Sequence, residues 1–327
     1  MSDAIAIIGD RFMLPSVFAD RIAAACGGNG VSIRTLEQPW PDRPMEHGYA
    51  DATLDRLKEF MGDPDEIAAF IGDAAMFVTH LAPVSRAMLE SLPNLKFIAV
   101  SRGGPVNIDV QAARDHGVLV VNTPGRNASA VAEFTIGAIL AETRLIRTGR
   151  ELGEMTVGVI GYGAIGSRVV KLLKAFGCTL LVADPYVQIT AQDRSDGVEH
   201  VALEALLARA DVITLHARVT PETTGFIGRE ALARTKKGAI FINTARGPMV
   251  DYDALYEALA SGQLGGAMLD TFAVEPVPPD WPLLRLPNIT LTPHIAGASV
   301  RTVTIAAGQA AEEVRRFLAG EPPLNPC

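Results

Sequence analysis

The sequence has little cysteine, few aromatic residues and no excess of positive charge. Its three cysteines, Cys26, Cys178 and Cys327, are too few and too scattered for a metal site or a disulfide framework, so we interpret them as incidental thiols and expect no metal. The net charge of −8 and the isoelectric point near 5.3 argue against nucleic acid or an anionic membrane as the main partner. Because we find neither an apolar run of membrane-spanning length nor a signal peptide, we expect a cytoplasmic protein.

The length and the overall composition indicate a globular protein with more than one domain. A chain of 327 residues exceeds the size of an ordinary single core, so we predict two domains. Hydrophobic residues make up 48% of the chain and charged residues 20%, which is typical of a globular α/β protein and not of a disordered one.

Short β-branched runs alternate with amphipathic stretches along the chain, which predicts parallel sheets covered by helices. In the first part we predict strands at Ala4–Gly9, Val31–Leu36, Ala74–Thr79, Lys96–Ser101 and Val118–Val121, and helices at Pro15–Ala25, Ala50–Met61 and Val84–Ser91. In the second part we predict strands at Thr156–Ile160, Leu180–Ala183, Val212–His216, Ile240–Thr244, Ala267–Asp270 and Ile289–Thr292. Its helices are expected at Phe134–Ile146, Ile165–Phe176, Leu203–Ala210, Arg229–Arg234, Tyr252–Ala260 and Val300–Leu318. The predicted fold class is α/β, with two doubly wound parallel sheets.

A glycine-rich motif follows the strand predicted at Thr156–Ile160 and opens the next helix. The motif reads Gly161-Tyr162-Gly163-Ala164-Ile165-Gly166. Alone it is weak, but a position between strand and helix is the context that dinucleotide binding requires. Gly161 allows a tight turn, Gly163 lets a pyrophosphate approach the backbone, and Gly166 lets helix and strand pack closely. The helix N-terminus, with Ala164 and Ile165, then offers N–H groups and a positive dipole end to the phosphates.

The next predicted strand ends at Asp184, which points to NAD as the cofactor. A carboxylate at this position accepts hydrogen bonds from both ribose hydroxyls and repels a 2′-phosphate, so it favours NAD over NADP. No Arg or Lys follows it directly in Pro185-Tyr186. The alternative, a plain glycine turn and a surface aspartate, is much weaker in this context.

Four later segments place ionisable residues after predicted strands, namely residues 215–223, 243–247, 270–276 and 292–297. Together they have the groups that reduction of a 2-oxo acid needs. The carbonyl oxygen requires a proton donor that titrates near neutrality, such as histidine. An arginine can hold the substrate carboxylate and polarise the carbonyl, and a carboxylate beside the histidine orients its ring. Each of these residues, taken singly, could equally be structural.

These motifs resemble those of the D-isomer-specific 2-hydroxyacid dehydrogenase family. The resemblance runs from about Ala74 to Gly297 and includes Asn122-Thr123-Pro124, Val131-Ala132-Glu133, the glycine motif and the four segments. It implies that Arg246 binds and polarises the 2-oxo acid, that His294 is the acid/base, and that Glu275 is its partner. It also implies that His216, Thr244 and Asp270 lie at the cofactor, and that backbone at Thr79 and Arg102-Gly103-Gly104 holds the substrate carboxylate.

The same resemblance implies a layout of two domains with the active site in the cleft between them. Residues 1–101 and 297–327 are expected to form a discontinuous, flavodoxin-like substrate domain, and residues 102–296 a Rossmann NAD-binding domain. Members of the family pair through an arm that precedes the glycine-motif strand, so we predict a homodimer. Here residues 148–153 lead to that strand almost at once, which means that this arm is shortened or that residues are missing from this sequence.

Three departures from the family pattern bear on the ligands. Arg218 stands where proline is usual, either near the adenosine or simply in solvent. Met76 and Val78 stand where phosphoglycerate dehydrogenases often carry phosphate-binding arginines, which argues against 3-phosphoglycerate. Arg102 replaces a glycine, and with Arg126 it leads to the hypothesis that the substrate has a second anionic or polyhydroxylated end.

Two alternatives remain beside a dehydrogenase of small anionic 2-hydroxy or 2-oxo acids. The first is an enzyme of the same scaffold that acts on another substrate, such as phosphite. The second is an NAD-sensing, corepressor-like binding protein, which would bind a partner in a cofactor-dependent way with little turnover.

Overall fold

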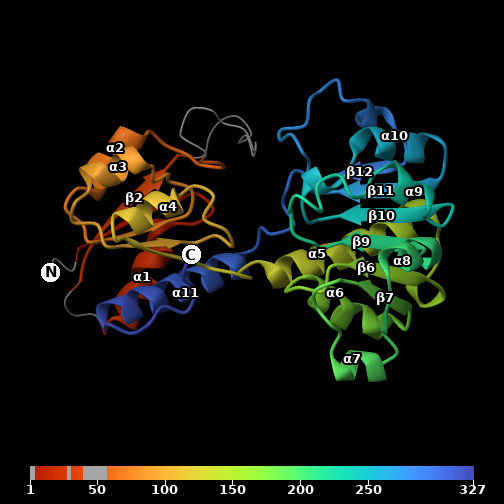
Figure 1. Ribbon diagram of the computed structural model, residues 1–327, viewed down its shortest axis with the longest axis horizontal. Helices are drawn as coiled ribbons and strands as arrows, with labels where there is room; N and C mark the ends of the chain where they lie inside the picture. The colour runs from red at the N-terminus through yellow and green to blue at the C-terminus, as the bar shows by residue number, and fades with distance from the viewer. Residues whose placement is uncertain (1–3, 28–30, 40–56) are drawn as a thin grey trace. The chain divides into compact units, whose positions relative to one another are not determined.

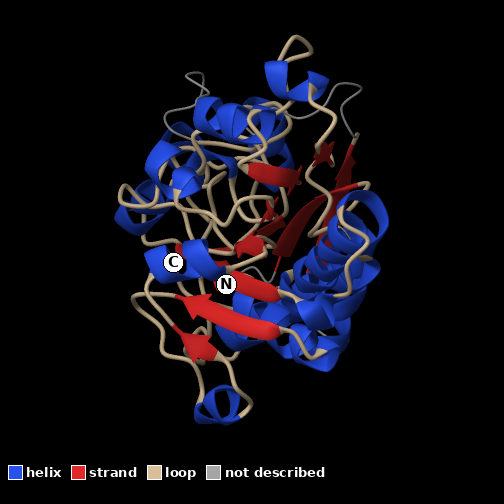
Figure 2. Ribbon diagram, turned by 90° about the vertical axis from the view of Figure 1, so that its right-hand side faces the viewer, coloured by secondary structure: helices blue, strands red, loops and turns tan. Residues whose placement is uncertain are grey.

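The computed structural model describes residues 4–27, 31–39 and 57–327, which form two compact units (Figure 1). Unit 1 comprises Met1–Arg126 and Ser299–Cys327, and unit 2 comprises Asn127–Ala298. Both units are parallel α/β structures, which confirms the predicted fold class. Figure 2 shows helices in blue lying against strands in red.

Within the described residues, unit 1 has a five-stranded parallel sheet in the order β2-β1-β3-β4-β5. Its strands are β1 (Ala4–Asp10), β2 (Ser32–Gln38), β3 (Met76–Thr79), β4 (Phe97–Val100) and β5 (Leu119–Asn122). Its helices are α1 (Pro15–Ala25), α2 (Pro64–Ile71), α3 (Arg86–Ser91), α4 (Val110–Asp115) and α11 (Val300–Leu318). This strand order is that of a flavodoxin-like sheet.

Alternation along β1 produces two separate hydrophobic cores in unit 1. Ala6 and Ile8 point to the face covered by α2, α3 and α4, whereas Ile5 and Ile7 point to the face covered by α1 and α11. Successive side chains of a strand face opposite sides of the sheet, so a run of apolar residues fits a strand buried on both faces. Figure 1 shows the two helical layers on either side of this sheet.

Unit 2 has a seven-stranded parallel sheet in the order β12-β11-β10-β9-β6-β7-β8, counted over the described residues. Its strands are β6 (Thr156–Ile160), β7 (Thr179–Ala183), β8 (Glu199–His200), β9 (Val212–Leu215), β10 (Ala239–Asn243), β11 (Leu264–Leu269) and β12 (Ile289–Leu291). Its α-helices are α5 (Ala128–Leu140), α6 (Gly166–Leu173), α7 (Ala191–Ser195), α8 (Leu203–Arg209), α9 (Arg229–Ala233) and α10 (Tyr252–Ala260). The order β8-β7-β6-β9-β10-β11 is the doubly wound order of a Rossmann sheet.

The boundary between the units differs from the one predicted. We placed it at residues 101 and 102, but β5 pairs in register with β4, so this strand joins the sheet of unit 1, and unit 1 extends to Arg126. The return to unit 1 comes at Ser299, two residues later than predicted. The sequence of β5 is typical of a buried strand, but no local pattern indicates which sheet the strand joins.

Other differences concern single elements. The helix predicted at Ala50–Met61 lies partly outside the described residues, and its described part, residues 57–61, is not helical. The helix predicted at Phe134–Ile146 begins earlier, at Ala128, and passes into a π-helical segment, Ala141–Arg147. The short elements α2, α4, α7 and β8 were not predicted.

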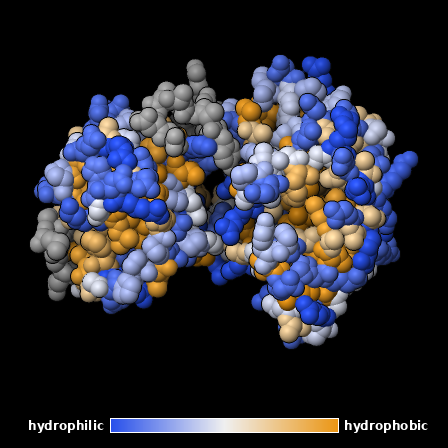
Figure 3. All heavy atoms as spheres, in the orientation of Figure 1, coloured by the Kyte–Doolittle hydropathy of each residue, from blue (hydrophilic) through white to orange (hydrophobic). Residues whose placement is uncertain are grey.

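On the face drawn in Figure 3, hydrophilic and hydrophobic side chains are interspersed on both units. Among the described residues, no helix combines the length and the apolar character that crossing a membrane requires.

Candidate functional site

The predicted residues of unit 2 follow strands at one edge of its sheet. The glycine motif follows β6, Asp184 follows β7 and His216 follows β9. The loops with Arg246, Glu275 and His294 follow β10, β11 and β12, which are neighbours in the sheet. The strand order reverses between β6 and β9, and ligands of open parallel sheets bind at such a point, outside the carboxyl ends of the strands.

The turn after β6 depends on two glycines. Gly161 has φ +91°, and a Cβ there would lie 2.7 Å from the backbone of His216 and Ala217. A Cβ at Gly166 would lie 2.0 Å from the carbonyl oxygen of Gly161, so α6 can begin this close to β6 only without a side chain. Both roles agree with those inferred from the motif.

The loop offers unengaged donors where a dinucleotide phosphate would bind. In the part of the chain that the structure describes, the N–H groups of Gly163, Ala164 and Ile165 donate no hydrogen bond. A Cβ at Gly163 would meet no atom within 4 Å, so the space beside this backbone is open. The donors and the open space fit the pyrophosphate of a dinucleotide at the N-terminus of α6.

Asp184 organises the turn beside the glycine motif. Its Oδ2 accepts a hydrogen bond from the N–H of Tyr162 at 2.7 Å, and its Oδ1 accepts from those of Tyr186 and Val187. The carboxylate is half-buried and stays close to the glycine backbone. This position agrees with the role of ribose acceptor that the sequence predicts for Asp184.

His216 is buried in the reversal between β6 and β9. Its Nε2 lies 2.9 Å from Oγ1 of Thr214, whereas its Nδ1 is buried without a hydrogen-bond partner among the described residues. Burial lowers the pKa of His216 to about 3, so the ring is neutral near pH 7. This agrees with a structural or cofactor-contacting role and gives no support to acid/base chemistry.

The side chain of Asn243, at the end of β10, shapes the turn that presents Arg246. Its Oδ1 accepts from the N–H of Ala245 at 3.0 Å, and its Nδ2 donates to the carbonyl of Arg246 at 3.1 Å. The adjacent Thr244 is buried and its hydroxyl lies 2.9 Å from that of Thr135 on α5. Arg246 itself is exposed, and its guanidinium donates to the carbonyl of Ala245. Asn243 begins one of the four segments singled out in the sequence, but the sequence analysis assigned it no role.

The loops after β10 and β11 pack directly against each other. A Cβ at Gly247 would lie 1.9 Å from the carbonyl carbon of Phe272, so glycine is needed for the approach. This contact brings the segment with Arg246 beside the segment with Glu275.

Glu275 and His294 form a hydrogen-bonded pair. Oε2 of Glu275 lies 2.8 Å from Nδ1 of His294, and Oε1 accepts from the N–H of Phe272 at 2.7 Å. Glu275 is buried, with 7% of its surface exposed. A carboxylate held in this way fixes the orientation of the imidazole ring.

Asp270 holds the loop that carries His294. Its Oδ1 accepts from the hydroxyl of Thr292 at 2.6 Å and from the N–H of Ile295 at 2.9 Å, and its Oδ2 accepts from the N–H of Ala296 at 2.9 Å. The carboxylate is fully buried. These bonds flank His294, whose φ of +54° is unusual for a residue with a side chain, and they hold it in that conformation.

In unit 1, the predicted substrate-binding residues follow β3 and β4. Thr79 is buried, and its hydroxyl accepts from the N–H of Ala82. A Cβ at Gly103 or Gly104 would meet no atom within 4 Å, and neither N–H donates a hydrogen bond within the described residues. The N–H of Arg102, by contrast, donates to the carbonyl of Val100.

Arg102 and Arg126, which led to the hypothesis of a second anionic end of the substrate, differ in how their guanidinium groups are paired. The guanidinium of Arg102 is paired with the carboxylate of Glu59 and donates to its carbonyl oxygen. Arg126 has no hydrogen bond or ion pair among the described residues, and its Nε is buried. Burial lowers the pKa of Arg126 to about 10. The sequence analysis gave no role to the side chains of Asp10 and His80, yet they lie 2.6 Å apart.

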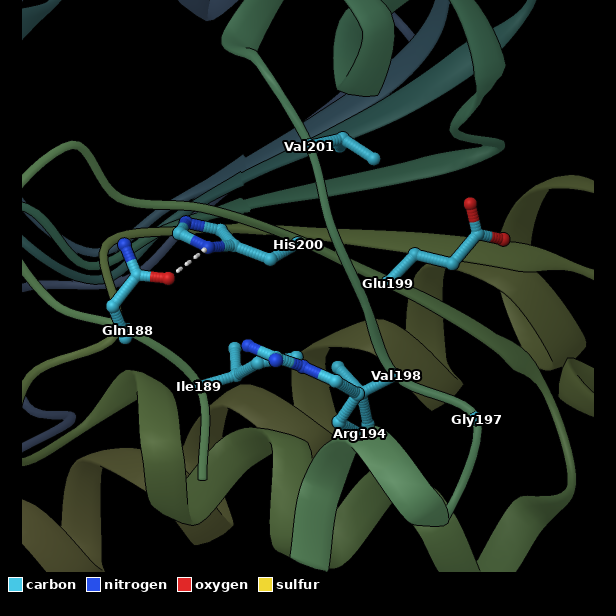
Figure 4. A pocket seen from close by; sticks show the side chains of 8 residues that line it. All are labelled: Gln188, Ile189, Arg194, Gly197, Val198, Glu199, His200 and Val201. Atoms are coloured by element: carbon cyan, nitrogen blue, oxygen red, sulfur yellow. Dashed lines mark hydrogen bonds between the residues drawn. The ribbon is translucent and has the colours of Figure 1, made fainter. Parts of the chain in front are cut away.

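Arg218 is exposed, and its carbonyl oxygen accepts from the hydroxyl of Thr223. A pocket of about 570 Å³ lies elsewhere in unit 2, lined by Gln188, Ile189, Arg194, Gly197, Val198, Glu199, His200 and Val201 (Figure 4). His200 and Gln188 point toward one another in it, and His200 also contacts the carbonyl of Asp184. None of the glycine-motif residues lines this pocket, so we do not assign the dinucleotide to it.

Residues 128–296 match the family described as D-isomer specific 2-hydroxyacid dehydrogenase, NAD binding domain. The chain belongs to this family. Unit 2 is therefore its NAD-binding domain, with NAD as the cofactor of the fold. This confirms the resemblance inferred from the motifs.

Relatives named for different activities are similar to this chain. D-3-phosphoglycerate dehydrogenase of Mycobacterium tuberculosis is 40% identical over 276 residues, covering 79% of this chain and 52% of the relative. The chain thus spans about half the length of such relatives. Glyoxylate reductase of Thermofilum pendens is 35% identical over 306 residues, covering 87% and 90%. The apo structure of D-lactate dehydrogenase from Escherichia coli superposes with a TM-score of 0.75 at 26% identity, covering 99% of each chain.

Proposed function

We propose that this protein is an NAD-dependent dehydrogenase that interconverts a small anionic 2-oxo acid and its D-2-hydroxy acid. The observation that carries the proposal is the 2.8 Å pair of Glu275 and His294, on loops of the same sheet edge as the glycine motif. Family membership supports the reaction class, and the D configuration rests on it alone. Unit 1 is proposed as the substrate domain.

NAD supplies the hydride acceptor or donor of this reaction. The exposed guanidinium of Arg246 binds the carboxylate and polarises the carbonyl of the 2-oxo acid. Nδ1 of His294 is engaged by Glu275, so proton exchange with the substrate oxygen falls to Nε2. The N–H groups of Gly103 and Gly104, together with backbone near Thr79, are proposed to bind the substrate carboxylate.

The cofactor is proposed to lie along the carboxyl edge of β6, β7 and β9. The N–H groups of the glycine motif bind the pyrophosphate, and Asp184 accepts from the ribose hydroxyls. Thr244, Asp270 and the backbone of His216 line the nicotinamide half. The chemistry of this donor set fits NAD better than NADP because Asp184 repels a 2′-phosphate.

The test is NADH oxidation by the purified protein across a panel of 2-oxo acids. The panel runs from glyoxylate and hydroxypyruvate to phosphohydroxypyruvate and longer sugar-derived acids, with NADPH in parallel. We expect turnover of at least one acid, and a loss of about 100-fold or more in kcat for His294→Asn. His116→Asn, which alters a histidine of unit 1 outside the site, is the matched control.

Tight NADH binding without turnover of any acid would contradict the proposal. NAD⁺ reduction by phosphite would then point to another substrate. Cofactor-dependent capture of a partner protein would instead point to a sensing role.

We also propose a homodimer that works in the cytoplasm. The segment between α5 and β6, through which family members pair, is short in this chain. Sedimentation of the purified protein therefore tests whether the dimer forms. A monomer at micromolar concentration would contradict the dimer without affecting the proposed chemistry.

A further inference from the structure

A second group of buried polar residues lies at the carboxyl edge of the sheet in unit 1. Asp10 is the last residue of β1, and His80 follows β3, which is the neighbour of β1. The strand order β2-β1-β3-β4-β5 reverses its direction of growth between β1 and β3. Parallel α/β sheets bind ligands at such a reversal.

Asp10 holds the ring of His80 in one orientation. Its Oδ2 lies 2.6 Å from Nδ1 of His80, and its Oδ1 accepts from the N–H groups of Phe12 and Met13 at 2.8 Å each. Asp10 is 1% exposed and His80 6%. Because the carboxylate accepts a hydrogen bond from Nδ1–H, Nε2 of the neutral ring is an acceptor, and no hydrogen bond to it occurs among the described residues.

The charges in this group favour a neutral His80. Burial, assisted by the nearby Arg126, lowers the pKa of His80 even though Asp10 raises it. Burial raises the pKa of Asp10, but the bonds from His80, Met13 and Phe12 lower it further, so the net shift is downward. Asp10 is thus ionised and His80 is an uncharged acceptor.

Arg126 lies beside this pair, four residues beyond the end of β5. Its charge interacts with Asp10 and His80. Unlike Arg102, whose guanidinium is paired with Glu59, it has no hydrogen bond or ion pair within the described residues, and its Nε is buried. Leaving a partly desolvated guanidinium unpaired is costly unless an anion binds it.

We propose that Arg126 and His80, the latter held by Asp10, recognise a second anionic group of the substrate together with a neighbouring hydroxyl. Arg126 binds a carboxylate or phosphate through its planar fork, and Nε2 of His80 accepts from the hydroxyl. This inference rests on the proposed dehydrogenase function, because it assigns the end of the substrate remote from the reacting carbon. It selects acids that carry a second acidic group and a hydroxyl over simple ones.

The experiment is calorimetric binding of four 2-hydroxy acids to the full chain, with and without saturating NADH. D-lactate, D-glycerate, D-malate and D-3-phosphoglycerate share the reacting end and differ only at the third carbon. Glycerate adds a hydroxyl to lactate, malate adds a carboxylate, and 3-phosphoglycerate adds a phosphate. Binding is measured without turnover, so the result does not depend on catalytic activity.

We expect malate or 3-phosphoglycerate to bind about tenfold or more tightly than lactate, and Arg126→Met to abolish this preference. The stronger of the two ligands identifies the anion as carboxylate or phosphate. His80→Gln and Asp10→Asn should each reduce the preference for glycerate over lactate. Arg114→Met, which removes an exposed arginine from α4, is the matched control.

Thermal unfolding supplies a readout that a structural role would not produce. Removing an unpaired, partly buried charge should leave the Tm of Arg126→Met equal to or above that of the wild type. Malate should raise the Tm of the wild type and not that of the variant. A lowered Tm for Arg126→Met, or an equal loss of affinity for all four acids, would overturn the inference.

The outcomes separate this inference from the proposed function. Discrimination among the four acids without turnover of any 2-oxo acid would leave the anion site standing and contradict the dehydrogenase. Turnover with equal affinity for all four acids would support the dehydrogenase and overturn the anion site.

Discussion

The carboxyl edges of the two sheets differ in how fully their charged side chains are paired. In unit 2, the carboxylates of Asp270 and Glu275 accept hydrogen bonds from groups of the same unit, and Glu275 orients His294. In unit 1, Asp10 and His80 are paired as tightly, but Arg126 beside them has no partner among the described residues.

This difference suggests that the two edges serve different functions. Proton transfer and hydride transfer are the same for every 2-hydroxy acid, so the groups that perform them can be preorganised by internal hydrogen bonds. The part of a substrate that varies must be recognised by groups that have no hydrogen-bond or ion-pair partner within the protein and can therefore bind the ligand. We therefore propose that the paired edge of unit 2 serves the chemistry common to all substrates and that the unpaired arginine of unit 1 serves the choice of substrate.

The largest expected effect comes from breaking the pair at the edge of unit 2. Glu275→Gln should lower kcat by about 100-fold, because an amide cannot stabilise the protonated imidazole of His294. Steady-state kinetics on the best substrate of the panel provide the measurement. Glu204→Gln, an exposed position on α8, is the control, and a kcat equal to that of the control would contradict the role of Glu275.

A smaller effect is expected at Asp270. In Asp270→Asn, the amide would present N–H groups to the N–H of Ile295 or Ala296, which should cost about 2 kcal/mol of unfolding free energy and lower kcat about tenfold. Urea unfolding in a Trp40→Phe background isolates the fluorescence of Trp281, which packs on Tyr252 in unit 2. An unchanged midpoint with a normal kcat would show that the loop with His294 does not need this anchor.

The next prediction concerns the cofactor preference, which we attribute to Asp184 at the same edge of the sheet. Asp184→Ser should raise the ratio of kcat/KM for NADPH to that for NADH by about tenfold, since the carboxylate that repels a 2′-phosphate is removed. Asp196→Ser removes an exposed carboxylate of unit 2 that is paired with Lys174 and serves as the control. If both variants keep the ratio of the wild type, Asp184 does not set the preference.

The last prediction concerns the pH dependence of stability caused by His216. The pKa of His216 is lowered by burial to about 3 in the folded state and is about 6.5 in an unfolded chain. Above pH 6.5 both states are neutral and the stability is fully present. As the pH falls below 6.5 the unfolded state binds the proton first, so the unfolding free energy drops by up to about 1.4 kcal/mol per pH unit.

The slope of the unfolding free energy against pH between pH 6 and pH 4.5, measured through the fluorescence of Trp281, should be reduced in His216→Gln. His116→Gln, in unit 1, should keep the slope of the wild type. Equal slopes in both variants would mean that His216 is accessible to protons in the folded state.

The sequence by itself determined the class of the fold and most of the candidate site in unit 2. Apolar runs buried on both faces of a sheet, separated by amphipathic stretches, have few solutions other than a parallel α/β structure. The glycine motif, Asp184 and the residues Arg246, Glu275 and His294 were readable because each follows a strand, and parallel strands end at the same edge of the sheet.

Only the tertiary structure decided the pairing of these groups and the boundary between the units. Asp10 and His80 are 70 residues apart in sequence, and their bond exists because β1 and β3 became neighbours. Strand β5 joined unit 1 through its pairing with β4, which no local pattern specifies. Arg102 and Arg126 look alike in sequence, yet Glu59 pairs with one and leaves the other unpaired, because charge pairing depends on which loops the fold brings together.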